Sequence, residues 1–542
     1  MRPPHGRTLF DLVLEQAERG PQRVAVIDGE RVATYRDLAG AAARLAAGMR
    51  GRGIGRGDRV GVLIGNRLEW LETVIGATAL GAVAVPLSTW SKPDELAYLL
   101  ADSEIDALVA IDRFGAQDFA GALDALIPEA SRHEPGEWRS RRFPRLGLIV
   151  MLGPPNRSGW IDYRALGAAE MLEPPPPGEG ASAADDCFVL YTSGSSARPK
   201  AVRLQHYAVI ENGFNIGERM GLTPEDRVLL APPLFWAYGA VNALPATLTH
   251  GAALVLQSRF EAGEWIGLVE RHRCTAIYTL PSLTGAVIRH PGFRRERVAS
   301  LRTGLMIGTP EEVRIAAVEL GVAQICNIYG ATEIYGNSCV TRSDLPLERR
   351  INSQGAPLPG TRLRIVDPAT GEALPRGATG AVEIAGYVTP GYCGASAVHN
   401  ATAFTRDGYF RTGDEGLLDD HGEFRFVARA ADIIKRAGIN VSPAEVETLL
   451  LQHPGVAEAA VVGAAAGERG EAIIAFVVPA AAAELTGAAL AAHCRGLASS
   501  YKVPDRIEIC PALPVTETGK VFRRALKERA AALLAEPAEP RP

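Results

Sequence analysis

The sequence predicts an α/β protein with a large N-terminal domain of α/β subdomains and a small C-terminal α+β domain. Buried-strand and amphipathic-helix signals alternate from about residue 34 to about residue 382. A charged, glycine-punctuated stretch follows at 407–440, and a compact set of strand and helix signals comes after it. With 542 residues, of which 47% are hydrophobic, the chain has enough apolar material for at least two cores.

The first predicted helix begins after Thr34. Thr34 and Asp37 have the spacing of a capping box, and apolar residues then recur at helical intervals. We expect a buried strand at 59–64, a helix at 68–80 and a short strand at 83–86. This alternation is typical of an α/β sheet.

The segment from about residue 128 to residue 186 has weak periodicity and many Arg, Pro and Gly residues, including four prolines at 174–177. We interpret it as an irregular surface excursion without a chemical role. Strand and helix signals resume at Cys187 and continue to about Val382.

The stretch 407–440 is the candidate domain junction, because charge and glycine interrupt the periodic pattern there. The elements expected after it form a compact α+β unit. They are a helix at 444–451, strands at 459–462 and 472–478, and a helix at 487–497 that Thr486 caps. We expect a frayed tail after Leu534.

Composition excludes several classes of protein. The 57 Lys and Arg residues against 62 Asp and Glu residues give a net charge of -5, which provides no general field for nucleic acid or an anionic membrane. The 7 cysteines are scattered without paired spacing, so neither a disulfide framework nor a zinc cage is indicated, and a reducing cytoplasm is the expected compartment. Asp11 and Glu15 stand where a signal peptide would need an apolar run, so the sequence predicts no signal peptide. Gly and Pro interrupt the most apolar stretch, 74–87, so we expect no membrane span.

A loop rich in hydroxyls and glycine follows the apolar run 187–190. It reads Tyr-Thr-Ser-Gly-Ser-Ser-Ala-Arg-Pro-Lys-Ala from Tyr191 to Ala201. Clustered backbone N–H groups, hydroxyls and one lysine suit a polyphosphate, although a polar surface turn would have the same composition. It is not a Walker A loop, because Lys200 follows Pro199 and the glycine spacing differs.

This loop and four further motifs resemble the adenylate-forming (ANL) superfamily of acyl-CoA synthetases, luciferases and peptide-synthetase adenylation domains, in particular its AMP-dependent acid-CoA ligase branch. The resemblance covers nearly the whole chain. The further motifs occur in the family's order: Tyr-Gly-Ala-Thr-Glu at 329–333, Phe-Arg-Thr-Gly-Asp at 410–414, the stretch 429–435 with Gly438, and Leu-Pro-Val-Thr-Glu-Thr-Gly-Lys at 513–520.

The resemblance implies ATP or AMP, Mg²⁺ and coenzyme A as ligands, and it assigns roles to individual residues. Lys520 and Glu333 are the implied catalytic residues, and Glu333 with Thr192 is implied to hold Mg²⁺, for which oxygen ligands are suitable. Asp414 and Arg429 would contact the ribose, Phe426 would pack near the nucleoside, and Asn327, Gly308 and Thr309 would border the adenine. The other implied nucleotide-binding residues are Ser193, Gly194, Ser195, Ser196, Lys200, Tyr329, Gly330 and Thr332. Each of these residues also has an ordinary structural interpretation. Glu333 could cap a helix, and Phe426 could belong to the core. Asp414, Arg429 and Lys520 could be solvated surface charges.

The implied chemistry has two steps. A small-molecule carboxylic acid attacks the α-phosphate of ATP and gives an acyl adenylate and pyrophosphate; a thiol then attacks the activated carbonyl and expels AMP. In the family the small domain rotates between the steps, so the implied division is residues 1–430 and a mobile domain at 431–542. Ala431 stands near the hinge position, and Gly438 matches the small residue that lines the thiol tunnel.

The sequence around Trp236 resembles the family's acyl-pocket helix, which implies acyl contacts from Trp236, Tyr238, Gly239 and Asn242. Amino-acid-activating relatives usually have Asp at the position of Trp236, so a tryptophan there favours an apolar acid without an α-amine. A core aromatic residue is the alternative reading. Because no carrier segment follows Lys520, we prefer coenzyme A as acceptor, and a stand-alone enzyme that loads a separate carrier protein remains an alternative.

The chain departs from the family at Ala197, Ala201 and Ala431, and Arg198, within the loop, places a bulky cation beside the expected pyrophosphate pocket. Glycine is usual at the first two positions, where backbone approaches phosphate closely. An alternative hypothesis is therefore that adenylation is impaired and that the chain only forms thioesters from an acyl adenylate made by a separate adenylating enzyme. A degenerate acyl-adenylate-binding protein and a luciferase-like oxygenase are further alternatives, and the retained Lys520 argues against the first of these.

Overall fold

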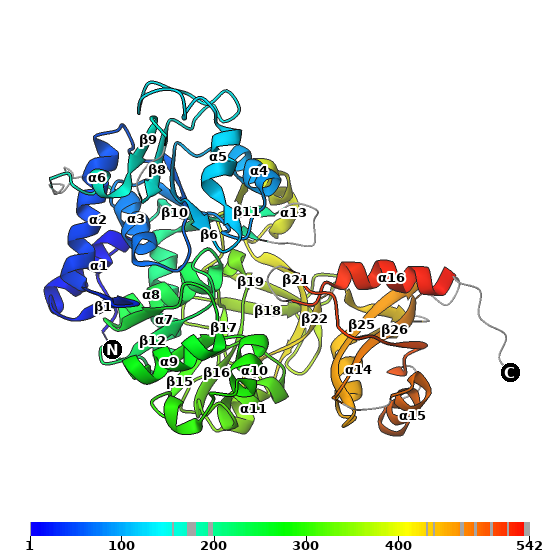
Figure 1. Ribbon diagram of the computed structural model, residues 1–542. Coiled ribbons are helices and arrows are strands. Elements are labelled where there is room, and N and C mark those ends of the chain that lie inside the picture. The colour runs from blue at the N-terminus through cyan, green and yellow to red at the C-terminus, as the bar shows by residue number, and fades with distance from the viewer. Residues whose placement is uncertain are drawn as a thin grey trace. The chain divides into compact units, whose positions relative to one another are not determined.

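The computed structural model describes residues 2–153, 157–170, 180–192, 199–429, 432–436, 439–466, 471–481, 485–498, 502–516 and 520–535 (Figure 1). It divides into two compact units. The first comprises Met1–Leu363 and Ile384–Phe410, and the second comprises Arg364–Glu383 and Arg411–Pro542. The boundary predicted from the sequence, at 430/431, separates a domain that is expected to rotate as one body. The division into compact units does not test such a motion, so this boundary stays a prediction.

The first unit contains two eight-stranded sheets, which are parallel except at their edges. One has the order β17-β16-β15-β14-β12-β13-β1-β2, with strands Cys339–Val340, Gln324–Tyr329, Thr303–Met306, Ala276–Thr279, Arg227–Leu230, Ala253–Leu256, Val24–Asp28 and Arg31–Thr34. The other has the order β20-β11-β10-β4-β3-β5-β8-β9, with strands Tyr392–Cys393, Lys200–Gln205, Asp186–Thr192, Val83–Pro86, Arg59–Leu63, Ala107–Ile111, Leu148–Leu152 and Trp160–Asp162. A short hairpin joins β6 (Arg113–Phe114) and β7 (Gln117–Asp118).

Helices connect these strands. They are α1 Leu9–Arg19, α2 Tyr35–Arg50, α3 Leu68–Ala79, α4 Pro93–Ser103, α5 Phe119–Leu126, α6 Tyr163–Leu166, α7 His206–Met220, α8 Leu244–Thr249, α9 Ala262–His272, α10 Pro281–Arg289, α11 Pro310–Val318, α12 Leu347–Ile351 and α13 Asn400–Ala403. A π-helix, η1 (Gly239–Ala243), precedes α8, and short 3₁₀ turns occur at η2 (Arg295–Val298), η3 (Thr332–Ile334) and η4 (Gly394–His399). The predicted α/β class is confirmed, and Thr34 caps α2 through the expected capping box.

The interpretation of 128–186 as an irregular excursion was wrong for a large part of it. Strands β8 and β9 extend the second sheet in parallel with β5, and the side chains of Trp138 and Phe143 are buried in its core. The run Leu148–Leu152 is apolar at all five positions, which is the pattern of a strand buried on both faces. The proline run 174–177 lies outside the described residues.

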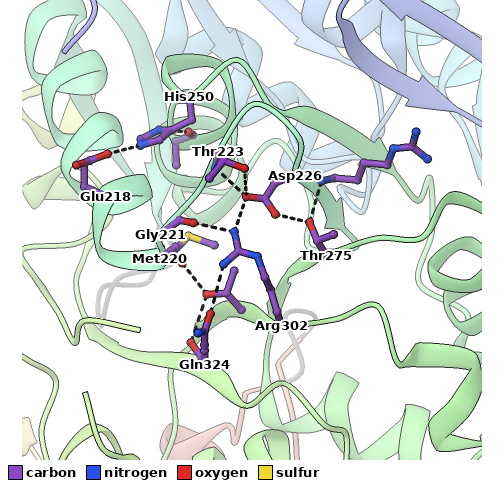
Figure 2. Close-up of polar contacts among 12 residues, drawn as sticks. Glu218, Met220, Gly221, Thr223, Asp226, His250, Thr275, Arg302 and Gln324 are labelled. Carbon is purple, nitrogen blue, oxygen red and sulfur yellow. Dashed lines mark hydrogen bonds and ion pairs between the residues drawn. The ribbon is translucent and has the colours of Figure 1, made fainter. Parts of the chain in front are cut away.

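A polar network joins the C-terminal end of α7 to the sheet of β12 and its neighbours (Figure 2). The carboxylate of Asp226 is 3% exposed and accepts hydrogen bonds from Thr223, Thr275 and Arg302, the last at 2.5 Å. Arg302 also donates to the carbonyl oxygen of Gly221, which ends α7 in the left-handed conformation at φ +66°. The network therefore satisfies a helix terminus and a buried carboxylate together.

His206, the first residue of α7, is expected to make the fold sensitive to acid. Its Nδ1 accepts a hydrogen bond from the backbone N–H of Leu9, and burial lowers the pKa of His206 to about 4. The unfolded chain therefore binds more protons than the folded chain between about pH 6.5 and about pH 4, and stability falls as pH falls through that window. The expected loss is about 3 kcal/mol.

Urea unfolding at several pH values measures this contribution. The variant His206→Gln keeps an acceptor for Leu9 without titrating, so its free energy of unfolding is expected to depend less on pH below 6.5. His133→Gln, at an exposed position of the same unit, serves as the matched control. If the free energy of unfolding of His206→Gln falls below pH 6.5 as steeply as that of the wild type, His206 is not the source of the acid sensitivity.

The second unit contains most of a four-stranded sheet in the order β18-β19-β21-β22, with strands Arg362–Val366, Gly380–Ala385, Phe410–Leu418 and Phe424–Arg429. A hairpin of β23 (Ile434–Arg436) and β24 (Ile439–Val441) precedes a three-stranded sheet of β25 (Val456–Ala465), β26 (Glu471–Pro479) and β27 (Arg506–Ile509). The helices of this part are α14 Pro443–Leu451, α15 Gly487–Leu497 and α16 Arg523–Ala535.

The predicted C-terminal elements are confirmed, including the cap of α15, where Thr486 accepts from the N–H of Ala489. Alternate residues of β25 and β26 face two separate cores. One core contains side chains of α14 and α15, and the other contains Leu526 and Ala530 of α16 (Figure 1). The tail after Leu534 lies almost wholly outside the described residues. Among the described helices, none is long and apolar enough to cross a membrane.

Candidate active site

The two ends of the predicted phosphate loop lie side by side. Thr192 ends β10 and pairs with Lys200, the first residue of the antiparallel strand β11. The ammonium of Lys200 stands 5.3 Å from the centre of the Tyr392 ring on β20. A cation over an aromatic face is attracted by the ring, so Tyr392 helps to fix the lysine. Ser193, Gly194, Ser195, Ser196, Ala197 and Arg198 lie outside the described residues.

Tyr392 also connects this lysine to the predicted catalytic carboxylate. Its hydroxyl donates to Oε1 of Glu333 at 3.0 Å, and the backbone carbonyl of Glu333 accepts from the N–H of Thr389 at 2.7 Å. Burial and the nearby Glu333 carboxylate raise the pKa of Tyr392, so the phenol stays protonated and donates. Thr192, Lys200 and Glu333 are thus brought into one region of the first unit.

The donor set in this region fits a magnesium ion. Glu333 is a half-buried carboxylate and Thr192 supplies a hydroxyl at the end of a strand, and hard oxygen ligands of these kinds are those that Mg²⁺ takes together with phosphate oxygens and water. A bound Mg²⁺ would offset the negative charge of the phosphates.

The turn that carries Glu333 requires glycine at position 330. A Cβ added to Gly330 would lie 1.7 Å from the carbonyl oxygen of Gly336, which is far inside van der Waals contact. Tyr335 has φ +55°, which is unusual for a residue with a side chain, and its ring is fully buried. Its hydroxyl accepts from the N–H of Gln205, so the turn is fastened to the end of β11 that lies farthest from the phosphate loop. Tyr329 is buried on β16 and Thr332 is half-buried in η3.

The predicted adenine-bordering residues follow the carboxyl ends of two adjacent parallel strands. Met306 of β15 pairs with Asn327 of β16, and Gly308 and Thr309 come directly after β15, where Thr309 caps α11. Asn327 is fully buried, its Oδ1 accepts from the N–H of Ile328, and its Nδ2 has no partner among the described residues. A buried donor without a partner is rare in folded proteins, so Asn327 fits a ligand that accepts a hydrogen bond.

The predicted acyl-binding residues divide into two kinds. Trp236 is half-buried in an aromatic cluster, with its ring centre 5.3 Å from that of Trp90 in an edge-on arrangement. The hydroxyl of Tyr238 donates to the carbonyl oxygens of Thr279 and Leu305 on two adjacent strands, and its half-buried ring stays a predicted acyl contact. Gly239 permits close packing, since an added Cβ would lie 2.5 Å from the carbonyl oxygen of Pro233. Asn242, on the π-helix η1, accepts from the hydroxyl of Tyr278 at 3.0 Å.

The predicted ribose contacts and the catalytic lysine belong to the second unit. Asp414 and Arg429 are paired across β21 and β22, with Arg429 Nε donating to Asp414 Oδ1 at 3.1 Å. Phe426, on β22, is 42% exposed, so it is not part of the core. The residue Lys520 is exposed, but neighbouring protein atoms desolvate its ammonium group, and this desolvation together with the charge of Arg429 lowers the pKa of Lys520.

The predicted hinge residue Ala431 and the predicted tunnel residue Gly438 lie outside the described residues. Beside the first of them, Asp432 forms an ion pair with Lys527 of α16 at 3.0 Å. The sequence did not single out Tyr392, which lies 59 residues after Glu333 in a short strand with no periodic signal. Only the fold shows that this tyrosine joins Lys200 to Glu333.

Known proteins resemble this chain over nearly its whole length. A family model described as AMP-binding enzyme matches residues 13–393, and one described as AMP-binding enzyme C-terminal domain matches residues 445–520. YngI of Bacillus subtilis strain 168 is 32% identical over 536 residues, which cover 96% of this chain and 97% of YngI. A feruloyl-CoA synthase of Amycolatopsis is 32% identical over 520 residues, which cover 95% and 98% of the two chains.

Two solved structures are similar over nearly the whole chain. ATP-bound MatB from Rhodopseudomonas palustris has a TM-score of 0.84 and 25% identity, with 97% of this chain and 99% of that one covered. The anthranilate CoA ligase AuaEII in complex with anthranoyl-AMP has a TM-score of 0.84 and 26% identity, with 98% of each chain covered. The expected fold, a large N-terminal and a small C-terminal domain of the ANL superfamily, is therefore confirmed.

Proposed function

The chain belongs to the AMP-binding enzyme family, and on that premise we propose that it is an AMP-forming acyl-CoA ligase that performs both half-reactions. The observation that carries the proposal is the link from Lys200 through Tyr392 to Glu333, because it joins a phosphate-binding lysine to a carboxylate in one region. Relatives that are described as CoA ligases or bind an acyl adenylate support it.

In the first half-reaction a carboxylate oxygen of the acid bonds to the α-phosphorus of ATP, and the bond to the bridging oxygen of pyrophosphate breaks. Lys200 holds phosphate oxygens as a positive charge, Asp414 accepts from the ribose hydroxyls, and Lys520 offsets the charge that develops between carboxylate and α-phosphate. Mg²⁺ held by Glu333 and Thr192 would neutralise phosphate charge. In the second half-reaction the sulfur of coenzyme A bonds to the acyl carbon and AMP leaves with both electrons of the broken carbon–oxygen bond.

The proposed substrate has an apolar body. Trp236 stands where a carboxylate would be needed to hold an α-amine, and the rings of Trp90 and Phe235 surround it. An aromatic or aliphatic acid makes favourable contacts with such a cluster, whereas an ammonium group would be desolvated there without a carboxylate partner.

Ala201 supports retention of the adenylation step. It lies in the regular antiparallel strand β11, paired with Tyr191, and its N–H donates to the hydroxyl of Ser396 at 3.1 Å. Extended backbone suits any residue, so this position does not require glycine.

Replacing Ala201 by glycine is therefore expected to leave pyrophosphate exchange unchanged or to lower it slightly, because glycine weakens a strand. Exchange measured on Ala201→Gly and on the conservative variant Ala201→Ser checks this expectation. A rise of tenfold or more in Ala201→Gly would instead support an impaired phosphate loop and adenylation by a separate enzyme.

The proposed function is tested by incubating the full chain with ATP, Mg²⁺, coenzyme A and a panel of aryl, alicyclic and fatty acids. Mass spectrometry is expected to detect an acyl-CoA together with AMP and pyrophosphate, dependent on one class of acid. ADP as the nucleotide product, or transfer only to a carrier protein added in place of coenzyme A, would contradict it.

A further inference from the structure

A carboxylate on α4 joins two parts of the chain that are far apart in the sequence. Asp102 is half-buried near the C-terminal end of α4. Its Oδ2 accepts from the hydroxyl of Tyr191 at 2.8 Å, and its Oδ1 accepts from the backbone N–H of Ala395 at 2.8 Å. Tyr191 lies on β10 directly before Thr192, and Ala395 belongs to η4. One side chain therefore connects α4, the end of β10 and η4.

The backbone of η4 is shaped for this close approach. Gly394 has φ +58°, and a Cβ added to it would lie 2.6 Å from Oδ2 of Asp102, so a side chain there would push the carboxylate away. Burial and the nearby Asp102 carboxylate raise the pKa of Tyr191, so its phenol stays protonated and donates. Both oxygens of Asp102 thus have defined donors.

The segment 392–396, which contains this contact, is also fastened to the start of β11. Strand β20 pairs with β11 at Ala201, and the hydroxyl of the buried Ser396 accepts from the N–H of Ala201 at 3.1 Å. The ring of Tyr392 lies under the ammonium of Lys200, 5.3 Å from it. The segment therefore holds the start of β11, and Asp102 ties the same segment to the end of β10.

We propose that Asp102 is a positioning residue for ATP, which fixes Thr192 and Lys200 where they meet its phosphates. Thr192 ends β10, and Lys200 begins β11 and pairs with it. Asp102 acts on the first through Tyr191 and on the second through the segment 392–396. This inference rests on the proposed acyl-CoA ligase function and names a further residue on which its ATP site depends.

The role concerns ATP more than AMP. Thr192 and Lys200 are predicted to serve the polyphosphate, with Mg²⁺ and as a positive charge respectively, and AMP has a single phosphate. Loss of the Asp102 contacts is therefore expected to change the ratio of the two affinities, because misplaced donors bind their acceptors less well. A residue that only stabilises the fold would change both affinities alike.

Charge and hydrogen bonding at Asp102 predict opposite results. A carboxylate near a polyphosphate repels it, so removal of the charge alone would strengthen ATP binding. The positioning role predicts that Asp102→Ala weakens ATP binding. Asp102→Asn is expected to preserve it, because an amide can accept from the N–H of Ala395 and donate to the oxygen of Tyr191.

The test measures binding of ATP with Mg²⁺, and separately of AMP, to the full chain by calorimetry without an acid. In Asp102→Ala the Kd for ATP is expected to rise about tenfold and that for AMP less than about twofold, since about one hydrogen bond is lost at the phosphates. Asp102→Asn is expected to bind ATP at least as tightly as the wild type.

Tyr191→Phe removes only the hydroxyl and tests the same contact from the strand. Because the hydroxyl acts through Asp102, the double variant with Asp102→Ala is expected to lose no more ATP affinity than Asp102→Ala alone. If Asp102→Ala does not fold, as judged by urea unfolding, the ATP-to-AMP ratio of Tyr191→Phe decides the question.

Asp94→Ala is the matched control, because Asp94 is an exposed carboxylate in the first turn of the same helix. It is expected to keep both wild-type affinities. Tighter ATP binding in Asp102→Ala, an equal loss for ATP and AMP, or additive effects of the two single changes would overturn the inference. If the wild type binds ATP but no acid gives a thioester, the proposed function fails, and the ratio of the two affinities still decides the role of Asp102.

Discussion

Lys520→Ala is expected to lower acid-dependent exchange of pyrophosphate into ATP by about 10²- to 10³-fold, the size of effect found when one electrostatic donor to a transition state is removed. Thioester formation from a preformed acyl adenylate and coenzyme A is expected to change less than about tenfold. The reason is that Lys520 offsets charge between the carboxylate and the α-phosphate, and this charge develops only in the adenylation step.

The pH dependence of exchange identifies the lysine independently. The charged form of Lys520 is required for the proposed role, and desolvation by neighbouring protein atoms together with the charge of Arg429 lowers the pKa of Lys520. Exchange is therefore expected to be maximal while Lys520 is protonated and to fall, as pH rises, at a pH below the ordinary lysine pKa of about 10.4.

Lys502→Ala provides a control in the same unit, because Lys502 forms a surface ion pair with Glu445 at 3.2 Å and is assigned no contact with the reactants. Its exchange rate is expected to stay near that of the wild type. Equal losses in both half-reactions of Lys520→Ala would show that the residue acts on folding or general binding instead.

Gly330→Ala is expected to abolish both half-reactions to within the assay background. The added Cβ would lie 1.7 Å from the carbonyl oxygen of Gly336, so the backbone of the turn must move, and Thr332 and Glu333 move with it. A displacement of about 1 Å at a reacting site costs about 10²-fold, and here the carboxylate that is predicted to hold Mg²⁺ is displaced directly. A fall in the free energy of unfolding of about 1–3 kcal/mol is expected as well.

Gly267→Ala is the matched control, because Gly267 lies within α9 and an added Cβ meets nothing within 4 Å. This variant is expected to retain activity and to gain slightly in stability, since alanine favours a helix over glycine. The steady-state rates and the urea unfolding curves of Gly330→Ala and Gly267→Ala are compared with those of the wild type. Wild-type activity in Gly330→Ala would show that the turn around Glu333 can relax without consequence.

Local signals in the sequence predict much of the fold. The capping box of Thr34 and the cap of Thr486 place the starts of α2 and α15, because a side-chain acceptor and its N–H donor lie within one helical turn. Leu148–Leu152 was missed because the surrounding Arg, Pro and Gly residues obscured an apolar run of only five residues. A short apolar run between turn signals is the pattern of a strand that is covered on both faces.

The candidate site is less visible from the sequence. Lys200, Glu333 and Asp414 are marked by motifs, whereas Tyr392 has no signal, since it joins Lys200 to Glu333 only after two sheets have formed. Tyr238 was predicted as an acyl contact from its place in the sequence alone. The sequence could not show that its hydroxyl donates to two strand carbonyl oxygens. The unpaired Nδ2 of Asn327 emerges only from three-dimensional packing, because hydrogen-bond satisfaction depends on partners far away in the chain.

The central claim is that this chain makes its own acyl adenylate and then transfers the acyl group to coenzyme A. The most direct measurement is acid-dependent exchange of labelled pyrophosphate into ATP by the wild type, alongside conversion of the chemically made adenylate of the same acid to its CoA thioester. The account predicts activity in both assays with the same class of acid. Thioester formation without any exchange would contradict it and assign adenylation to another enzyme.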